Sequence, residues 1–447
     1  MTKVNRRSFI TSTTAVSGVA ATAAGTTRAA SLLTKGRGVS ANDRMAIGVI
    51  GCGARGRSLL KDFLQVDEVE CLALADVDTK HSGEVAQIVS EQRRHAPDTY
   101  QDFRHLLERD DLDVVIVATP DHWHALPTIM ACQAGKDVYC EKPLATSIEE
   151  GRAMVDAARK YDRVVQVGTQ QRSSPHYREA VEFVRSGQLG TIRSVRAWAF
   201  LDWKGALGNP EDTDPPASVD YDFWLGPAAL RPFNPIRFHY YFRWFWDYSG
   251  GLMTDWGAHM VDIGIWAMGE DPVGAMAVGG KYGYPDDIME TPDTQTSVVK
   301  FPSFSLIWEH QVGCGIGPWE REHGVEFRGN NGTLVVDRAG WEVHSETDSM
   351  GKPREYRMQG IPRRKGSSGY DLDHVVNFLD CVRSREKPVA DVETNHRSVN
   401  ACHLANIALR LDACVSWDPA EEKIGGDERA ESLVGRKYRQ PWKLPRV

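Results

Sequence analysis

The sequence predicts an α/β domain with a parallel sheet, followed by an α+β domain with a large open, mostly antiparallel sheet. Between residues 45 and 167, short apolar runs alternate with helical patterns, an order typical of a parallel sheet covered by helices on both faces. Beyond residue 167, strand patterns follow one another without helices between them, which favours an antiparallel or mixed sheet. We therefore expect a first domain over residues 44–167 and a second over 168–447, the latter ending in helices.

Composition narrows the classes of function. The 447 residues are 41% hydrophobic and 26% charged, with a net charge of −8, as in ordinary globular proteins. The chain has no excess of basic residues, so its charge does not indicate a nucleic-acid partner. It also has no apolar stretch of 18 residues, so no membrane span is predicted. The eight cysteines are irregularly spaced and form no C-x-x-C pair, which argues against a zinc knuckle or a redox dithiol.

The elements of the first domain come from short apolar runs and amphipathic segments. We expect buried strands at Met45–Ile50, Glu70–Ala75, Asp113–Ala118, Lys136–Cys140 and Arg163–Val167. We expect helices at Arg57–Val66, Ala125–Ala134 and Ile148–Tyr161.

A glycine-rich turn follows the first strand directly. It reads Gly51-Cys52-Gly53-Ala54-Arg55-Gly56, and Asp76 ends the second strand. In a dinucleotide site the first glycine permits the tight turn, the second admits the pyrophosphate and the third allows close helix–strand packing, while the acid binds the ribose hydroxyl. We therefore predict a Rossmann domain that binds NAD or NADP through Gly51, Gly53, Ala54, Arg55, Gly56 and Asp76, and the charge of Asp76 favours NAD.

Two later turns carry further polar residues where ligands bind such sheets, just beyond the strands. They read Thr119-Pro120-Asp121-His122-Trp123-His124 and Glu141-Lys142-Pro143. With the glycine turn, they resemble the glucose–fructose oxidoreductase/inositol dehydrogenase/rhizopine catabolism (Gfo/Idh/MocA) family, over about Ala46 to Trp442. The resemblance implies that Lys142 lies at the nicotinamide and the substrate hydroxyl. Cofactor contacts are expected from Thr119, Pro120, Asp121, His124, Glu141 and Lys142.

The histidines of the first of these turns have alternative roles. His124 either caps the following helix or touches the cofactor. The pair His122 and His124 offers two metal ligands, but no further partner accompanies them, and we predict no metal site.

In the second domain, Gln170 and Arg172 follow the last strand of the parallel sheet and are expected in a substrate pocket. We predict a helix at Pro175–Ser186, strands at Ile192–Leu201, Gly274–Tyr282, Thr294–Phe301, Phe304–Gln311, Gly324–Arg328 and Gly332–Asp337, and helices at Asp371–Ser384 and Thr394–Leu411. The long loop Lys204–Asp220 is a candidate lid or subunit contact.

The segment Arg237–Trp266 is dense in aromatic residues. Aromatic faces suit sugar rings, although core or interface packing explains most of these rings, with one or two facing substrate. His239 and Arg243 are the candidate substrate ligands here.

The same segment continues as Gly250-Gly251-Leu252-Met253-Thr254-Asp255-Trp256-Gly257-Ala258-His259-Met260-Val261-Asp262. On one helix, Asp255, His259 and Asp262 share a face. The stretch resembles the family's G-G-G-x-x-x-D-x-G-x-H-x-x-D helix, with Ser249 in place of the first glycine, so Asp255 and His259 match its catalytic pair. His259 suits a general base, and Asp255 suits an orienting or substrate-binding role. A metal site on the three polar residues is the rival interpretation.

The N-terminus reads Asn5-Arg6-Arg7-Ser8-Phe9-Ile10, followed by a mild apolar stretch to about Ala30. This resembles a twin-arginine export signal, and a disordered N-terminal tail is the alternative. We expect residues 1–30 to engage the Tat machinery and the protein to be periplasmic or otherwise exported.

Together these features predict an NAD(P)-dependent oxidoreductase that transfers hydride between a tightly bound nicotinamide and a secondary alcohol of a sugar, polyol or sugar derivative, with Lys142, Asp255 and His259 as the catalytic residues. A redox-neutral enzyme that cleaves or epimerises glycosides is the first alternative, and a non-catalytic sugar-binding protein is the second. The family resemblance also implies a homo-oligomer.

Overall fold

The computed structural model describes residues 44–447 except 94, 349–354 and 426–427. The predicted export signal lies outside the described residues. No helix in the described part of the chain is long and apolar enough to cross a membrane.

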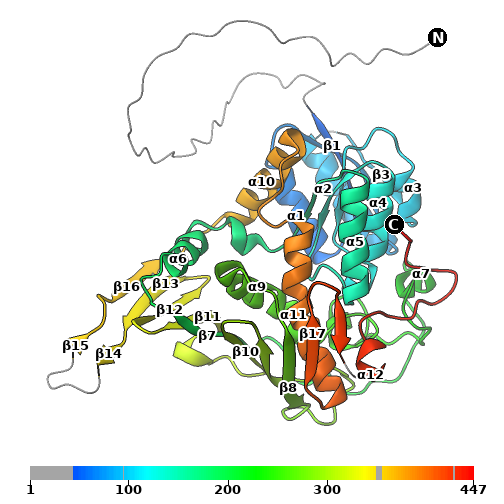
Figure 1. The fold of residues 1–447 in the computed structure, drawn as a ribbon. Coiled ribbons are helices and arrows are strands. Elements are labelled where there is room, and N and C mark those ends of the chain that lie inside the picture. Colours follow the sequence, from blue (N-terminus) through cyan, green and yellow to red (C-terminus); the bar gives the residue numbers. More distant parts are fainter. Residues whose placement is uncertain (1–43, 94, 349–354, 426–427) are drawn as a thin grey trace, which may run out of the picture. The chain divides into compact units, whose positions relative to one another are not determined.

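A six-stranded parallel sheet forms the first layer, with strand order β3-β2-β1-β4-β5-β6 (Figure 1). Its strands are β1 (Met45–Ile50), β2 (Val69–Ala75), β3 (Asp98–Tyr100), β4 (Val114–Val117), β5 (Asp137–Cys140) and β6 (Val165–Val167). The helices between them are α1 (Ala54–Phe63), α2 (Thr79–Arg93), α3 (Phe103–Leu107), α4 (Ala125–Gln133) and α5 (Ile148–Lys160). The sequence prediction lacked α2, β3 and α3, which have weak apolar patterns, and it began α1 three residues late.

A ten-stranded sheet forms the second layer, with order β16-β13-β12-β11-β7-β10-β9-β8-β17-β18. Its strands are β7 (Ile192–Leu201), β8 (Gly274–Gly280), β9 (Thr294–Lys300), β10 (Ser305–Val312), β11 (His323–Gly329), β12 (Gly332–Asp337), β13 (Gly340–Ser345), β16 (Ile361–Lys365), β17 (Val415–Asp418) and β18 (Lys423–Gly425). All neighbouring pairs are antiparallel except β7 and β10, which run parallel. The predicted fold class is confirmed.

The remaining helices are α6 (Pro175–Arg185), α7 (Tyr221–Leu225), α8 (Gly251–Asp255), α9 (Gly257–Met268), α10 (Tyr370–Ser384), α11 (Val392–Leu411) and α12 (Glu428–Glu431). The short strands β14 (Thr347–Asp348) and β15 (Glu355–Tyr356) pair antiparallel. Figure 1 shows α9 and α11 against one face of the ten-stranded sheet.

Helix α10 belongs, by its packing, to the core of the first layer. Its buried Val375, Phe378 and Leu379 join the cluster that contains Leu59 and Phe63 of α1. The Phe378 ring meets the Phe63 ring edge-on, with their centroids 6.2 Å apart. The C-terminal part of the chain therefore returns to complete the parallel sheet's surroundings.

Candidate active site

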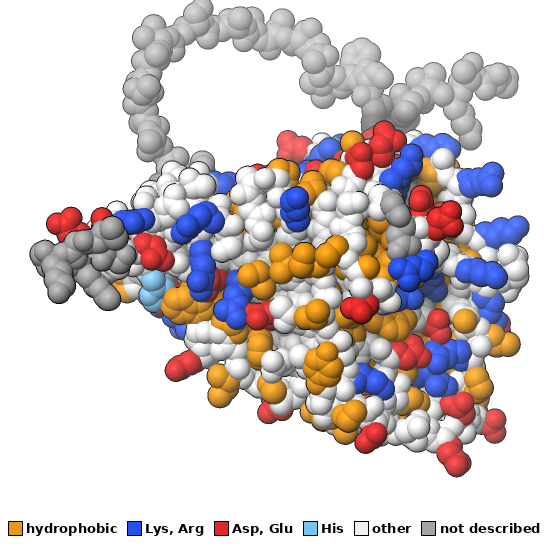
Figure 2. Space-filling view, turned by 60° about the horizontal axis from the view of Figure 1, so that its bottom comes forward, with side chains coloured by type: hydrophobic (Ala, Val, Ile, Leu, Met, Phe, Trp, Pro, Cys, Tyr) orange, Lys and Arg blue, Asp and Glu red, His pale blue; other side chains and the backbone are white. Residues whose placement is uncertain are grey.

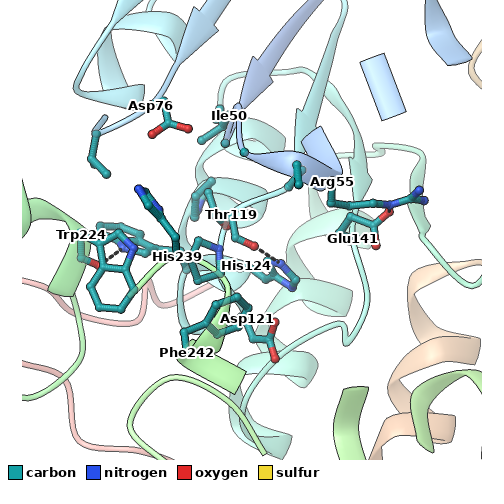
Figure 3. Close-up of a pocket in the computed structure, with 18 of the residues that line it drawn as sticks. Ile50, Arg55, Asp76, Thr119, Asp121, His124, Glu141, Trp224, His239 and Phe242 are labelled. Carbon is teal, nitrogen blue, oxygen red and sulfur yellow. Dashed lines mark hydrogen bonds and ion pairs between the residues drawn. The ribbon is translucent and has the colours of Figure 1, made fainter. Parts of the chain in front are cut away.

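A cavity of about 490 Å³ lies at the carboxyl ends of the parallel strands. Its walls come from the turns after β1, β2, β4 and β5 and from the segment between β7 and β8. Figure 3 shows Asp76, Thr119, Asp121 and His239 gathered around this space. The position agrees with the rule that such sheets bind ligands beyond the carboxyl ends of their strands.

The glycine turn has the geometry that a dinucleotide phosphate needs. Gly51 has φ of +93°, a conformation that side chains disfavour. A Cβ on Gly56 would lie 1.9 Å from the carbonyl oxygen of Gly51, so only glycine lets α1 approach β1 this closely. Gly53, the N-cap of α1, provides no capping side chain. The first N–H groups of α1 therefore stay available for an anion.

Asp76 lies at the cavity wall, held by main-chain groups. Its carboxylate accepts hydrogen bonds from the backbone N–H of Cys52 (2.6 Å) and of Asp78 (2.8 Å). Burial raises the pKa of Asp76, and these two hydrogen bonds oppose that shift. The carboxylate is therefore held in a fixed orientation beside the cavity.

The turn after β4 is held in place by hydrogen bonds from its side chains to backbone carbonyl groups. His122 Nε2 and the Trp123 indole N–H both lie 2.9 Å from the carbonyl oxygen of Trp224. The ring nitrogens of His124 lie 2.9 and 2.7 Å from the carbonyl oxygens of Thr119 and Pro143. His124 therefore ties this turn to the Glu141-Lys142-Pro143 turn, and its side chain makes no capping hydrogen bond to α4.

Lys142 and Arg243 converge on Asp255. Lys142 Nζ donates to the Asp255 carboxylate and to its backbone carbonyl, and an Arg243 N–H donates to the other carboxylate oxygen at 2.8 Å. Burial alone would raise the pKa of Asp255, but the Arg243 and Lys142 cations hold it well below its usual range. The cluster thus places two cations around the Asp255 carboxylate, and the carboxyl of Asp121, whose pKa is raised by burial, lines the same cavity.

His259 lines the cavity beside this cluster. Burial and the Lys142 and Arg338 cations lower its pKa well below the ordinary value for histidine. The ring is therefore neutral near pH 7. Its Nδ1 is buried and has no hydrogen-bond partner among the described residues.

Asp262 does not share this site. The helix breaks at Trp256, which separates α8 from α9. Asp262 instead forms two 2.7 Å hydrogen bonds with Arg172 and accepts a third from Ser398 at 2.6 Å. Arg172, a predicted substrate ligand, is therefore engaged with Asp262 and absent from the cavity wall. The candidate metal set of Asp255, His259 and Asp262 is not assembled here.

The cavity wall collects most of the other predicted site residues. It is lined by Gly51, Gly53, Ala54, Arg55, Asp76, Thr119, Pro120, Asp121, His124, Glu141, Lys142, Gln170, His239, Arg243, Asp255 and His259, whereas Gly56 packs against Gly51 and does not line it. Arg55 and Glu141 pair at 2.7 Å. In the aromatic segment, Phe238 and Trp244 are buried, whereas Tyr240 and Phe242 reach the cavity.

Sequence reasoning missed several lining residues. His81, Gln101, Phe103, Phe223 and Trp224 line the same cavity. None belongs to a motif, and four of them lie on the helices α2, α3 and α7, which the sequence analysis did not predict. Phe223 and Trp224 follow Asp220, whose N–H donates to the carbonyl of Val77 at 2.9 Å, so only the folded chain reveals their position.

Two family models match this chain. One, described as "Oxidoreductase family, NAD-binding Rossmann fold", matches residues 45–169. The other, described as "Oxidoreductase family, C-terminal alpha/beta domain", matches residues 183–280 and 368–444. The chain belongs to the Gfo/Idh/MocA oxidoreductase family. Its first part is the NAD-binding Rossmann domain of that family.

Relatives within the Gfo/Idh/MocA family carry different names. A "Myo-inositol 2-dehydrogenase" of Thermotoga maritima is 24% identical over 85% of this chain and 100% of its own length. A "Glycosyl hydrolase family 109 protein" of Shewanella pealeana is 38% identical over 26% of this chain and 27% of its own length. Several of the matched curated relatives are covered over less than two thirds of their length.

A solved structure shares the fold. "Levoglucosan dehydrogenase, complex with NADH and levoglucosan" superposes with a TM-score of 0.63 at 18% identity, covering 83% of this chain and 99% of that chain. This likeness supports the two-layer arrangement.

Proposed function

We propose that this protein oxidises or reduces a secondary alcohol of a sugar, polyol or sugar derivative, using a tightly held nicotinamide dinucleotide. The observation that carries the proposal is the convergence of Lys142, Asp255 and His259 in the same cavity as the glycine turn and Asp76. The names of relatives that act on inositol or levoglucosan support a carbohydrate substrate.

The chain's own groups fit each part of the reaction. When bound, the nicotinamide supplies the hydride acceptor. His259, neutral near pH 7, accepts the hydroxyl proton of the alcohol. The Lys142 ammonium stabilises the negative charge that develops on that oxygen. Asp255 fixes the position of Lys142 through its ion pair, and the reverse transfers reduce a ketone.

The position of Arg243 extends this scheme. Its guanidinium is held by Asp255 and by the carbonyl oxygen of Tyr240 at 3.1 Å, and Tyr240 and Phe242 lie beside it on the wall. An arginine among aromatic rings suits the hydroxyls and C–H faces of a sugar. We assign Arg243 and Gln170 to substrate binding.

The cofactor preference follows from Asp76. Its carboxylate is oriented by two backbone N–H groups and would repel a 2′-phosphate, which favours NAD over NADP. Tight retention fits the contribution of the second domain to this wall, because His239 lines the cavity on the side that carries Asp76 (Figure 3).

Export by the twin-arginine route explains why retention would matter. That route carries folded proteins, and free NAD is scarce outside the cytoplasm. A retained cofactor must then be reoxidised in place by a second carbonyl compound, or it must return its hydride to the same substrate. Return of the hydride to the same substrate is the redox-neutral alternative. The name of the Shewanella pealeana relative, "Glycosyl hydrolase family 109 protein", supports this alternative as a second candidate.

A homo-oligomer is the expected assembly. Figure 2 brings the lower side of Figure 1 forward and shows hydrophobic side chains among charged ones. On β8, Met276 and Val278 are 50% and 66% exposed, which is unusual for adjacent outward positions of a strand. Light scattering coupled to gel filtration measures the mass of the particle in solution, and the mass of a single chain would contradict this expectation.

One experiment tests the proposed function. The purified full-length protein is examined for nicotinamide absorbance, and any released nucleotide is identified by mass spectrometry. We expect bound NAD that is reduced by at least one sugar in a panel of inositols, aldoses and anhydrosugars. Release of nitrophenol from a nitrophenyl glycoside without net reduction would select the redox-neutral enzyme. No bound nucleotide and no turnover after NAD addition would refute both.

A further inference from the structure

Three side chains from distant positions meet at the nucleotide end of the cavity. Asp78, His81 and His239 place a carboxylate oxygen and two imidazole nitrogens within 4.8 Å of one another. His81 and His239 line the cavity, and Asp78 is buried behind them. Figure 3 shows the His239 ring directed toward the side of the cavity that carries Asp76.

The three residues come from both parts of the molecule. Asp78 precedes α2 and His81 lies in its first turn, whereas His239 belongs to the segment between β7 and β8. The loop that precedes this segment is docked here too, because Asp78 forms an isolated β-bridge with Val219. His239 has φ of +48°, a backbone conformation that is uncommon for residues other than glycine.

The carboxylate of Asp78 is already oriented. Its Oδ1 accepts a hydrogen bond from the backbone N–H of Lys80 at 3.0 Å, which leaves Oδ2 directed at His239 Nε2, 3.2 Å away. Two ligand atoms on a tetrahedral Zn²⁺ lie about 3.4 Å apart, given bond lengths of about 2.1 Å. The Asp78–His239 pair already has this spacing, and the backbone hydrogen bond is the kind of outer support that metal-binding carboxylates use.

The second imidazole is close enough to complete the set. The rings of His81 and His239 have centroids 4.4 Å apart and are tilted by 38°. One nitrogen of each ring and a carboxylate oxygen of Asp78 all lie within 4.8 Å of one another. Two imidazoles and one carboxylate form the ligand set that zinc and its neighbours in the first transition row bind well, whereas Mg²⁺ prefers oxygen ligands.

We propose that Asp78, His81 and His239 form a site for a divalent transition-metal ion of the Zn²⁺ type. The ion joins the start of α2 to the His239 segment of the second part of the chain. Remaining coordination positions open to the cavity, where water or a polar group of a ligand can occupy them. This site is separate from Lys142, Asp255 and His259 and does not depend on the reaction assigned to them.

The test is a titration of the metal-stripped full-length protein with Co²⁺, followed by its visible d–d absorption. We expect saturation near one equivalent per chain, displacement by Zn²⁺ and no displacement by excess Mg²⁺. The variants His239→Gln, His81→Gln and Asp78→Asn should each weaken Co²⁺ binding by more than about tenfold, since even outer-shell changes cost 10–100-fold. Asparagine keeps an acceptor for the Lys80 N–H and so preserves the start of α2.

His105→Gln is the matched control. His105 is an exposed histidine beside Glu108 on the first domain, and its removal should leave the Co²⁺ titration unchanged. Circular dichroism verifies folding, and Zn²⁺ should raise the melting temperature of the wild type but not of His239→Gln. A titration that never saturates near one equivalent, or binding that is equal in the wild type and all folded ligand variants, would overturn the site.

Discussion

Two buried ion pairs connect the parallel sheet to α8 and α9, and they differ in how completely their charges are satisfied. Arg172 and Asp262 are 3% and 1% exposed, face each other in a bidentate pair and are supplemented by Ser398. Lys142 and Asp255 are 17% and 9% exposed, line the cavity and have Arg243 as an additional cation. The first pair is balanced and closed, whereas the second leaves a cation available to a ligand.

This difference separates a supporting role from a reactive one. A closed pair matters for stability because removing one partner leaves the other as an unpaired buried charge. A pair with surplus positive charge in a cavity can stabilise negative charge that develops on a ligand. The following predictions probe that distinction, from the largest expected effect to the smallest.

The largest effect is expected at the reactive cluster. His259→Ala should lower the rate of hydride transfer by about 10²–10⁴, the range for a positioned acid–base group. Stopped-flow measurement of nicotinamide absorbance, with the active sugar, provides the rate. His105→Gln serves as the control, and a rate unchanged in His259→Ala would remove histidine from the base role.

At the closed pair, Arg172→Ala should cost about 3–5 kcal/mol of folding free energy, because it leaves the Asp262 carboxylate buried without its partner. Urea denaturation measures the loss. The double variant Arg172→Met with Asp262→Leu should recover part of it, since it removes both charges. Full stability in Arg172→Ala would contradict the closed-pair description.

Lys142→Met should lower activity more than stability, unlike Arg172→Ala. Hydride transfer should fall by about 10²–10³, as when one donor to a developing oxyanion is removed. Stability should fall by less than in Arg172→Ala, because Arg243 still compensates Asp255. Parallel kinetic and urea measurements on the two variants give the contrast. A Lys142→Met protein that is less stable than Arg172→Ala yet as active as wild type would abolish the distinction.

The smallest effect concerns pH. Burial lowers the pKa of His374 to about 4, and the pKa of His259 is also depressed. Below the ordinary histidine pKa of about 6.5 the unfolded chain binds more protons than the folded one, so stability falls as pH falls, by up to about 1.4 kcal/mol per pH unit for each such group. His259→Gln should make this slope shallower between pH 6.5 and 5, measured by urea denaturation. An unchanged slope would show that His259 is not held neutral.

Asp255 contributes in a different range. Because its folded-state pKa lies below its usual value, its contribution to stability is present above the unfolded pKa of about 3.9 and is lost only as pH falls below it. The histidine effect and the aspartate effect are therefore separated along the pH axis.

The sequence predicted those features of the fold and of the site that are determined by contacts local in the chain. The sequence predicted the glycine turn, Asp76 and the turns that carry His124 and Lys142. Each of these follows a strand directly, and the parallel sheet brings all strand ends together. The fold class followed from the same alternation.

Other features could not be read because they arise from tertiary contact. Spacing alone placed Asp255 and Asp262 on one helix face, but the helix break at Trp256 sends them to different partners. Arg172 was expected beside substrate because it follows β6, and nothing local reveals that Asp262 engages it. His81 and His239 are far apart in sequence, so their proximity exists only in the folded chain.

The return of α10 to the first layer affects the order in which the protein can mature. Strands β1–β6 are synthesised early, yet the side chains of Val375, Phe378 and Leu379 that pack beside Leu59 and Phe63 emerge from the ribosome late. The nucleotide-binding domain therefore keeps an apolar flank open during most of translation. A chain truncated before residue 370 should expose that flank and become a substrate for chaperones and proteases.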